Sequence, residues 1–126
     1  MQKKSLSGLR RKFLRKAEEK MKRREEYFKT YIKRLIDSFP KISIVLIGSR
    51  AKGEPLPYSD YDVVIILEEI NNKFEFIKEA RKYKPKGFNL DLIVLEKDEL
   101  NDPLVLQMLK HGILLHDSLG IAKYLK

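Results

Sequence analysis

The chain has 126 residues and no cysteine; 43% of its residues are hydrophobic and 36% are charged. This length suits one domain with a single core, and the composition excludes a disulfide framework and a thiolate zinc site. The longest apolar run covers residues 63–67, far short of the roughly 20 residues that a membrane helix needs. We therefore expect a soluble, cytoplasmic protein that does not bind membranes.

The net charge of +9 is concentrated in the first part of the chain. Residues 1–36 carry 14 Lys or Arg and four Glu, whereas residues 37–126 are close to neutral. A basic block of this kind attracts nucleic acid or an acidic protein surface, or forms the solvated face of a helix. Charge alone leaves these alternatives open.

The basic segment has helical periodicity, and we expect Pro40 to end the helix near Ser38. Its apolar residues mostly recur at steps of three, four or seven: Leu6, Leu9, Phe13, Ala17, Met21, Phe28, Ile32 and Leu35. A helix of roughly 30 residues is about 45 Å long, more than the width of so small a core. We expect its first turns to project, and to fray or pack on another chain, which would allow a homo-oligomer. We separate this basic amphipathic helix, residues 1–40, from residues 41–126 within one compact domain.

The remaining residues alternate between strand and helix patterns. Apolar, β-branched runs predict strands at 42–47, 61–67 and 88–95, with a short edge strand at 113–115. Helices are predicted at 71–83 and 98–110 and from Asp117 onward, and a turn at 50–57. The predicted class is α/β (α+β), a small mixed sheet flanked by helices with a long basic N-terminal helix.

One stretch has the character of a metal and phosphate site. Gly48-Ser49 ends the first strand, ten residues follow, and Asp60-Tyr61-Asp62 opens the second strand. Residues at i and i+2 of a strand share a face, so Asp60 and Asp62 are held about 7 Å apart and repel each other without a cation. Oxygen ligands of this kind suit Mg²⁺, which completes its coordination with substrate phosphates.

The residues beside this pair suit phosphate groups. Gly48 has no Cβ, so a triphosphate can approach its backbone. Ser49 offers a hydroxyl and an N–H, and Arg50 and Lys52 can neutralise phosphate charge. We add Ser59 to the nucleotide-binding candidates, although a Ser-Asp pair also fits ordinary turn chemistry.

A third acid fits the same site. Asp91 is the only charge inside an otherwise apolar strand, where a carboxylate is costly without a partner or a metal. If this strand neighbours the one that carries Asp62, Asp91 can complete a two-metal site and help to deprotonate an attacking hydroxyl. Each feature is common alone, but the ordered combination favours a functional interpretation.

This order of residues resembles the DNA polymerase beta-like nucleotidyltransferase superfamily, and within it the one-domain minimal nucleotidyltransferases. The resemblance covers about residues 42–95, and the Gly-containing segment at 110–117 is similar to the one that follows in such proteins. It implies a palm-like mixed sheet and the transfer of a nucleoside monophosphate, most simply AMP from ATP, from an NTP to a hydroxyl. By this resemblance Asp60, Asp62 and Asp91 are the metal-binding and catalytic carboxylates, whereas Gly48 and Ser49 hold phosphates.

The resemblance also implies a partner. Minimal members are often paired with a small helical protein of the HEPN type, which they can adenylylate on a tyrosine, acting as the antitoxin of a toxin–antitoxin module. The basic helix is not part of the signature, so its role does not transfer. The alternative is a protein- or RNA-binding module that uses this helix and has weak or vestigial transfer activity. In that alternative RNA ranks below a protein partner.

Overall fold

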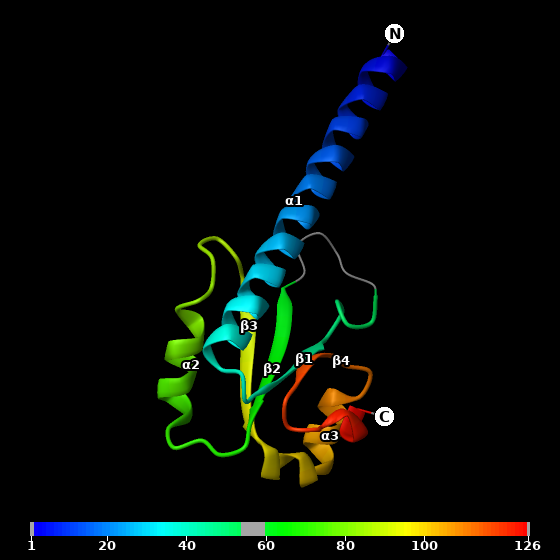
Figure 1. The fold of residues 1–126 in the computed structure, drawn as a ribbon. Coiled ribbons are helices and arrows are strands. Elements are labelled where there is room, and N and C mark those ends of the chain that lie inside the picture. Colours follow the sequence, from blue (N-terminus) through cyan, green and yellow to red (C-terminus); the bar gives the residue numbers. More distant parts are fainter. Residues whose placement is uncertain (1, 54–59, 126) are drawn as a thin grey trace.

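The computed structural model describes residues 2–53 and 60–125, with side chains from residue 8 onward, and Figure 1 shows its fold. Its helices are α1 (Gln2–Ser38), α2 (Lys73–Arg81) and α3 (Pro103–Leu109), with two 3₁₀ helices, η1 (Lys97–Asn101) and η2 (Ala122–Leu125). Its strands are β1 (Ser43–Ile47), β2 (Tyr61–Leu67), β3 (Leu90–Glu96) and β4 (Ile113–Asp117). The expected mixed α/β architecture is confirmed, and none of the described helices could span a membrane.

The strands form a sheet in the order β3-β2-β1-β4. β2 pairs with β3 in parallel, whereas β1 is antiparallel to both β2 and β4. The end of β1 and the beginnings of β2 and β3 therefore lie at the same edge of the sheet. Because the sequence places its candidate catalytic residues here, we call this edge the catalytic end.

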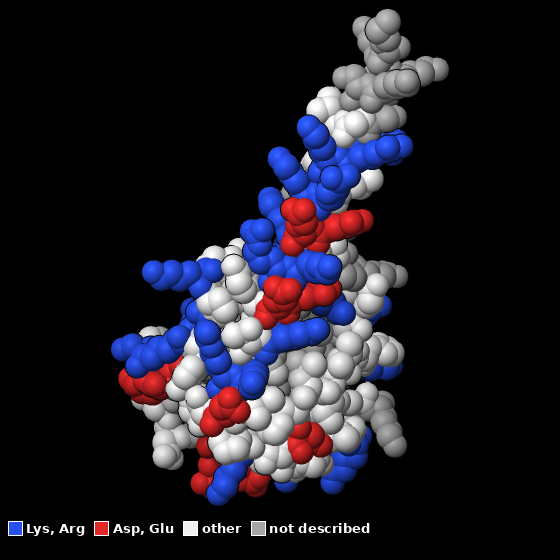
Figure 2. Space-filling model, turned by 45° about the horizontal axis from the view of Figure 1, so that its top comes forward, with Lys and Arg blue, Asp and Glu red and all other residues white. Residues whose placement is uncertain are grey.

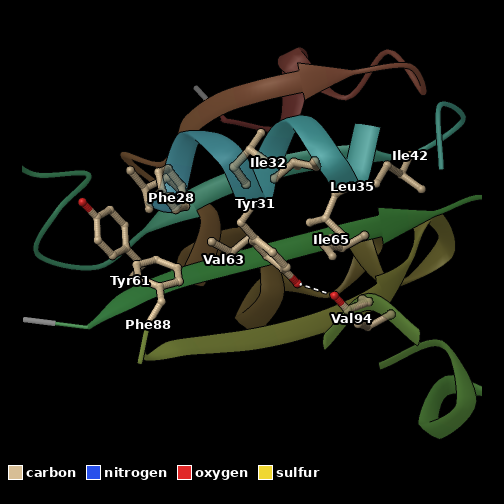
Figure 3. Close-up of a cluster of buried hydrophobic side chains, with 13 residues drawn as sticks. Phe28, Tyr31, Ile32, Leu35, Ile42, Tyr61, Val63, Ile65, Phe88 and Val94 are labelled. Carbon is tan, nitrogen blue, oxygen red and sulfur yellow. Dashed lines mark hydrogen bonds between the residues drawn. The ribbon is translucent and has the colours of Figure 1, made fainter. Parts of the chain in front are cut away.

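Helices cover both faces of the sheet, which explains why β2 reads as a nearly continuous apolar run. On one face, α1 and α2 pack over Tyr61, Val63 and Ile65, as Figure 3 shows for this core. On the other face, α3 and the two 3₁₀ helices pack over Val64 and Ile66. Alternation along β2 places Asp62 on this second face, which we call the α3 face.

α1 is much longer than the sheet that it covers. Among the side chains described from residue 8 onward, the buried ones lie in the last third of α1: Phe28, Tyr31, Ile32 and Leu35. Leu9 and Phe13, by contrast, are 62% and 66% exposed. Strands of five to seven residues span about 17–23 Å, whereas the 37 residues of α1 span about 55 Å. The first part of α1 therefore projects as expected, past the catalytic end (Figure 1).

The helix predicted at 98–110 is wrong as a single element. The chain forms η1 and then α3, because Pro103 cannot extend a preceding helix and instead begins a new one. The Asp102 carboxylate caps α3 by accepting a hydrogen bond from the Leu104 N–H at 2.9 Å.

The final helix does not begin at Asp117, which is the last residue of β4. The Asp117 carboxylate accepts hydrogen bonds from the Ser43 hydroxyl at 2.8 Å and from the Ile121 N–H at 2.9 Å. These contacts hold a turn after β4, and only the short η2 follows.

Tyr31 joins α1 to α2 and gives a test of the fold. Its hydroxyl is buried and donates a hydrogen bond of 2.9 Å to the Ala80 carbonyl (Figure 3), and burial raises its pKa. We expect Tyr31→Phe to lower the free energy of unfolding by about 1–2 kcal/mol, because the Ala80 carbonyl loses this buried donor. Tyr27→Phe, on a half-buried tyrosine of the same helix, should change it by less than about 0.5 kcal/mol. Urea unfolding measures both, and equal effects would contradict the role of this bond.

Candidate active site

Three candidate residues meet at the catalytic end because of the strand register. Ile47 of β1 pairs with Asp62 of β2, and Asp62 pairs with Asp91 of β3. Gly48, the residue after β1, therefore lies beside the first carboxylate, and Asp91 lies on its other side. The sheet thus brings Gly48, Asp62 and Asp91 together across three neighbouring strands.

The two paired carboxylates lie on the α3 face. Residues in register on parallel strands share a face, and Asp91 lies two and four positions before Ile93 and Leu95, which pack against α3 and η1 with Val64. Asp62 is half-buried and Asp91 is exposed. The pair is therefore open to solvent at the rim of an apolar layer.

The electrostatics of this pair favour a bound cation. Burial raises the pKa of Asp62, and the hydrogen bond and charge of Asp91, with the charge of Asp60, raise it further. A carboxylate that resists ionisation beside two others is relieved by a proton or by a metal ion. All three are hard oxygen donors, which fit Mg²⁺.

Gly48 is needed for this arrangement. Its φ is +80°, and a Cβ at this position would collide with the Asp62 carboxylate. Its carbonyl accepts hydrogen bonds from the N–H groups of Ala51 and Lys52 at 3.1 and 3.3 Å, which closes a tight turn. The turn leaves Ser49 and Lys52 exposed to solvent.

Asp60 takes a different partner from the other two acids. It lies just before β2 with its side chain 51% exposed, and its carboxylate is 3.7 Å from the guanidinium of Arg24 on α1. Sequence reasoning missed Arg24, although it lies one turn before Phe28 on the stripe that faces the sheet. Among the described residues no three Asp, Glu, His or Cys side chains gather closely enough to hold a metal ion. The structure therefore shows an Asp62–Asp91 pair with Asp60 turned toward α1.

The structure places Arg50 on the face opposite Asp62 and Asp91. The ring of Tyr61 stacks on Phe28 with 4.3 Å between centroids (Figure 3), and the Arg50 guanidinium lies 4.0 Å from the centre of the Tyr61 ring. Arg50 also donates a hydrogen bond of 3.2 Å to the Tyr61 hydroxyl. Arg50 is thus on the α1 face, opposite Asp62 and Asp91, and Ser59 lies outside the described residues.

Comparisons with known proteins show the family and the fold. The sequence matches the family of nucleotidyltransferase domains over residues 26–115. The fold is similar to a crystal structure of a protein from Sulfolobus solfataricus that is proposed to be a nucleotidyltransferase. The two are 27% identical with a TM-score of 0.58, over 78% of this chain and 84% of the other. A search of curated proteins finds no match.

Two glycines with similar positive φ values, Gly48 and Gly53, test whether the Asp62 carboxylate lies in close contact with Gly48. Gly53 also has a positive φ, of +77°, but nothing in the described structure lies within 4 Å of a Cβ there. We expect Gly53→Ala to lower the free energy of unfolding by about 1–2 kcal/mol through backbone strain. Gly48→Ala must also push the end of the Asp62 side chain aside, so it should cost about 2–3 kcal/mol. Chemical unfolding measures both, and a Gly48→Ala cost no larger than that of Gly53→Ala would contradict the close contact.

The raised pKa of Asp62 predicts a pH-dependent gain in stability for Asp62→Asn. Because its folded-state pKa lies above the model value of 3.8, ionisation of Asp62 destabilises the folded chain. This penalty is present at neutral pH and absent below about pH 3.8. Asp62→Asn should therefore raise the melting temperature at pH 7 in EDTA, and the gain should disappear on acidification. Asp37→Asn, at an exposed position of α1, is the control; a lower melting temperature for Asp62→Asn at pH 7 would contradict the prediction.

Proposed function

The chain belongs to the nucleotidyltransferase domain family, and on this premise we propose that it transfers a nucleoside monophosphate from an NTP to a hydroxyl acceptor. AMP from ATP is the first case to test. The proposal depends on one observation, the register that sets Asp62 beside Asp91 at the edge of the sheet where β1 ends in Gly48. Carboxylates and a bare glycine backbone at one edge suit a metal-bound triphosphate.

Each carboxylate has a role in this proposal. Asp60, Asp62 and Asp91 would hold two Mg²⁺ ions, which would neutralise charge on the triphosphate. Asp91 also accepts the proton of the acceptor hydroxyl. The hydroxyl oxygen then forms a bond to the α-phosphorus, the bond between that phosphorus and the bridging oxygen breaks, and pyrophosphate leaves. Most of the rate gain comes from positioning and electrostatic stabilisation.

The turn after β1 is proposed to bind the phosphates. Gly48 and Ser49 present backbone and hydroxyl groups, and Lys52 is an exposed cation in the same turn. Ser59 lies outside the described residues, so its role in nucleotide binding stays a prediction. For Arg50, also predicted to bind phosphate, the stack on Tyr61 supports a second role, holding this turn against α1.

We propose a protein hydroxyl as the acceptor, on a tyrosine of a HEPN-type partner, with the chain acting as its antitoxin. Support comes from the projecting part of α1, which extends past the catalytic end and exposes Leu9, Phe13 and Leu14. Apolar side chains on an isolated helix are stabilised by a protein partner rather than by water. Labelling of such a partner from α-³²P-ATP, lost in its Tyr→Phe variant, tests this acceptor.

Calorimetric titration with ATP tests the nucleotide site. We expect ATP to bind with Mg²⁺ and to lose at least about tenfold in affinity in EDTA and in Asp62→Asn. Asp60→Ala should abolish transfer to the acceptor. The control is Asp98→Asn, which removes an exposed carboxylate of η1, beyond the far end of β3. ATP binding that is equal in Asp62→Asn and in the unmodified chain would contradict the proposed site.

A second function, an interaction module with little or no transfer activity, is favoured by the surface of α1. Residues 8–24 carry nine Lys or Arg and two Glu, and Figure 2 shows the basic side chains along the projecting helix. The exposed Leu9 and Phe13 on the same segment favour a protein partner with an acidic rim over RNA.

Acidic substitutions on the apolar side of α1 separate the two functions. If binding is the main role, Leu9→Glu with Phe13→Glu should abolish partner binding. Asp62→Asn should then leave the effect of the partner on cell growth unchanged. If transfer is the main role, Asp62→Asn should abolish the effect of the chain on growth in the presence of the partner. Growth rescue against the partner toxin measures this effect. Binding to single-stranded RNA that falls steeply with salt and survives the two Glu substitutions would instead indicate an RNA ligand.

A further inference from the structure

α1 contacts two consecutive residues of the Asp60-Tyr61-Asp62 motif. The Arg24 guanidinium lies 3.7 Å from the Asp60 carboxylate, and the Phe28 ring stacks on the ring of Tyr61. Arg24 and Phe28 are four residues apart, so they lie on the same face of the helix. The helix face that joins the core thus also reaches the acidic motif.

The burial of the two partners is unequal. The side chain of Arg24 is 18% exposed, whereas that of Asp60 is 51% exposed. Arg24 is therefore the more enclosed partner of the ion pair, and the Asp60 carboxylate is the partner more open to solvent. Of these two groups, Asp60 is the one free to change partner.

The acidic site is incomplete while this ion pair lasts. Asp62 and Asp91 are already paired, but in the described residues no third ligand joins them. Asp60 lies just before β2, two residues from Asp62, and its charge already contributes to the raised pKa of Asp62. This inference has the Asp60 carboxylate turn from Arg24 toward the pair when a cation binds.

We propose that Arg24 is a positioning residue that holds the Asp60 carboxylate in the metal-free protein and competes with the divalent cation for it. This inference rests on the proposed function, because it assumes a metal site at Asp62 and Asp91. Arg24 satisfies the charge of Asp60 until a cation replaces it. Metal binding and the Arg24–Asp60 ion pair therefore oppose each other.

The effect to measure is the affinity for Mn²⁺, followed by the electron paramagnetic resonance of the free ion in 0.15 M salt without nucleotide. Because partly exposed ion pairs are weak, Arg24→Met should tighten Mn²⁺ binding only by roughly two- to fivefold. Arg24→Lys keeps a cation at the position and should stay close to the unmodified chain. In an Asp60→Asn background, Arg24→Met should have no further effect, since the carboxylate for which both compete is gone.

Arg23→Met is the matched control. Arg23 is the exposed neighbour of Arg24 on α1, so its loss removes the same charge from the helix without touching the ion pair. At this ionic strength we expect it to change Mn²⁺ affinity by less than about 1.5-fold. Thermal melting of every variant in EDTA verifies that each is folded.

The outcomes separate this inference from the proposed function. If the unmodified chain binds no Mn²⁺, both fail. If it binds Mn²⁺ but Arg24→Met binds equally or more weakly, the role of Arg24 fails and the metal site stands. Equal tightening in Arg23→Met and Arg24→Met also overturns it, because a general charge effect then explains the change.

Discussion

The pairing of β1, β2 and β3 is the constraint on which the site depends. An antiparallel pair beside a parallel pair brings one strand end and two strand beginnings to the same edge. That edge joins the glycine turn after β1 to carboxylates on β2 and β3. A shift of one residue in either pairing would turn Asp62 or Asp91 toward the α1 face, among apolar side chains. Burial of β2 on both faces therefore secures the register and, with it, the acidic pair.

The fold keeps three carboxylates close together although they repel one another. Asp60, Asp62 and Asp91 repel one another, and Gly48 leaves no space for a side chain beside them. The large core on both faces supplies the stability that this local conflict removes. α1 adds a second restraint, because Phe28, Tyr61 and Arg50 form a stack that joins the helix, β2 and the turn after β1. The long helix is thus part of the framework of the site as well as a projecting arm.

Much of this arrangement could be predicted from local sequence signals. Alternation along residues 61–67 places Asp62 and Val64 on one face, and the lone charge at Asp91 marks a second strand with a special residue. Pro40 sets the end of α1. The break before Pro103 could also be predicted, because a proline preceded by a capping aspartate marks the start of a new helix. The interpretation of 98–110 as one helix overlooked this signal.

The features that could not be predicted depend on contacts between distant residues or on the direction of one side chain. Arg24 and Asp60 are 36 positions apart in the chain, and only the docking angle of α1 brings them together. Arg50 follows the Gly48-Ser49 motif directly, yet it turns to the opposite face to stack on Tyr61. Periodicity does not specify side-chain direction in a turn, so the stack of Arg50 on Tyr61 could not be predicted from the sequence.

The most direct test of the central claim is a crystal structure with Mn²⁺ and a non-hydrolysable ATP analogue, with the metal located by its anomalous signal. We predict an anomalous peak between the carboxylates of Asp62 and Asp91, with the triphosphate against the turn at Gly48 and Ser49. Binding of the nucleotide in the cavity of about 480 Å³ lined by Gln107, Lys110 and Tyr124, with no metal at the acidic pair, would contradict the assignment of the site.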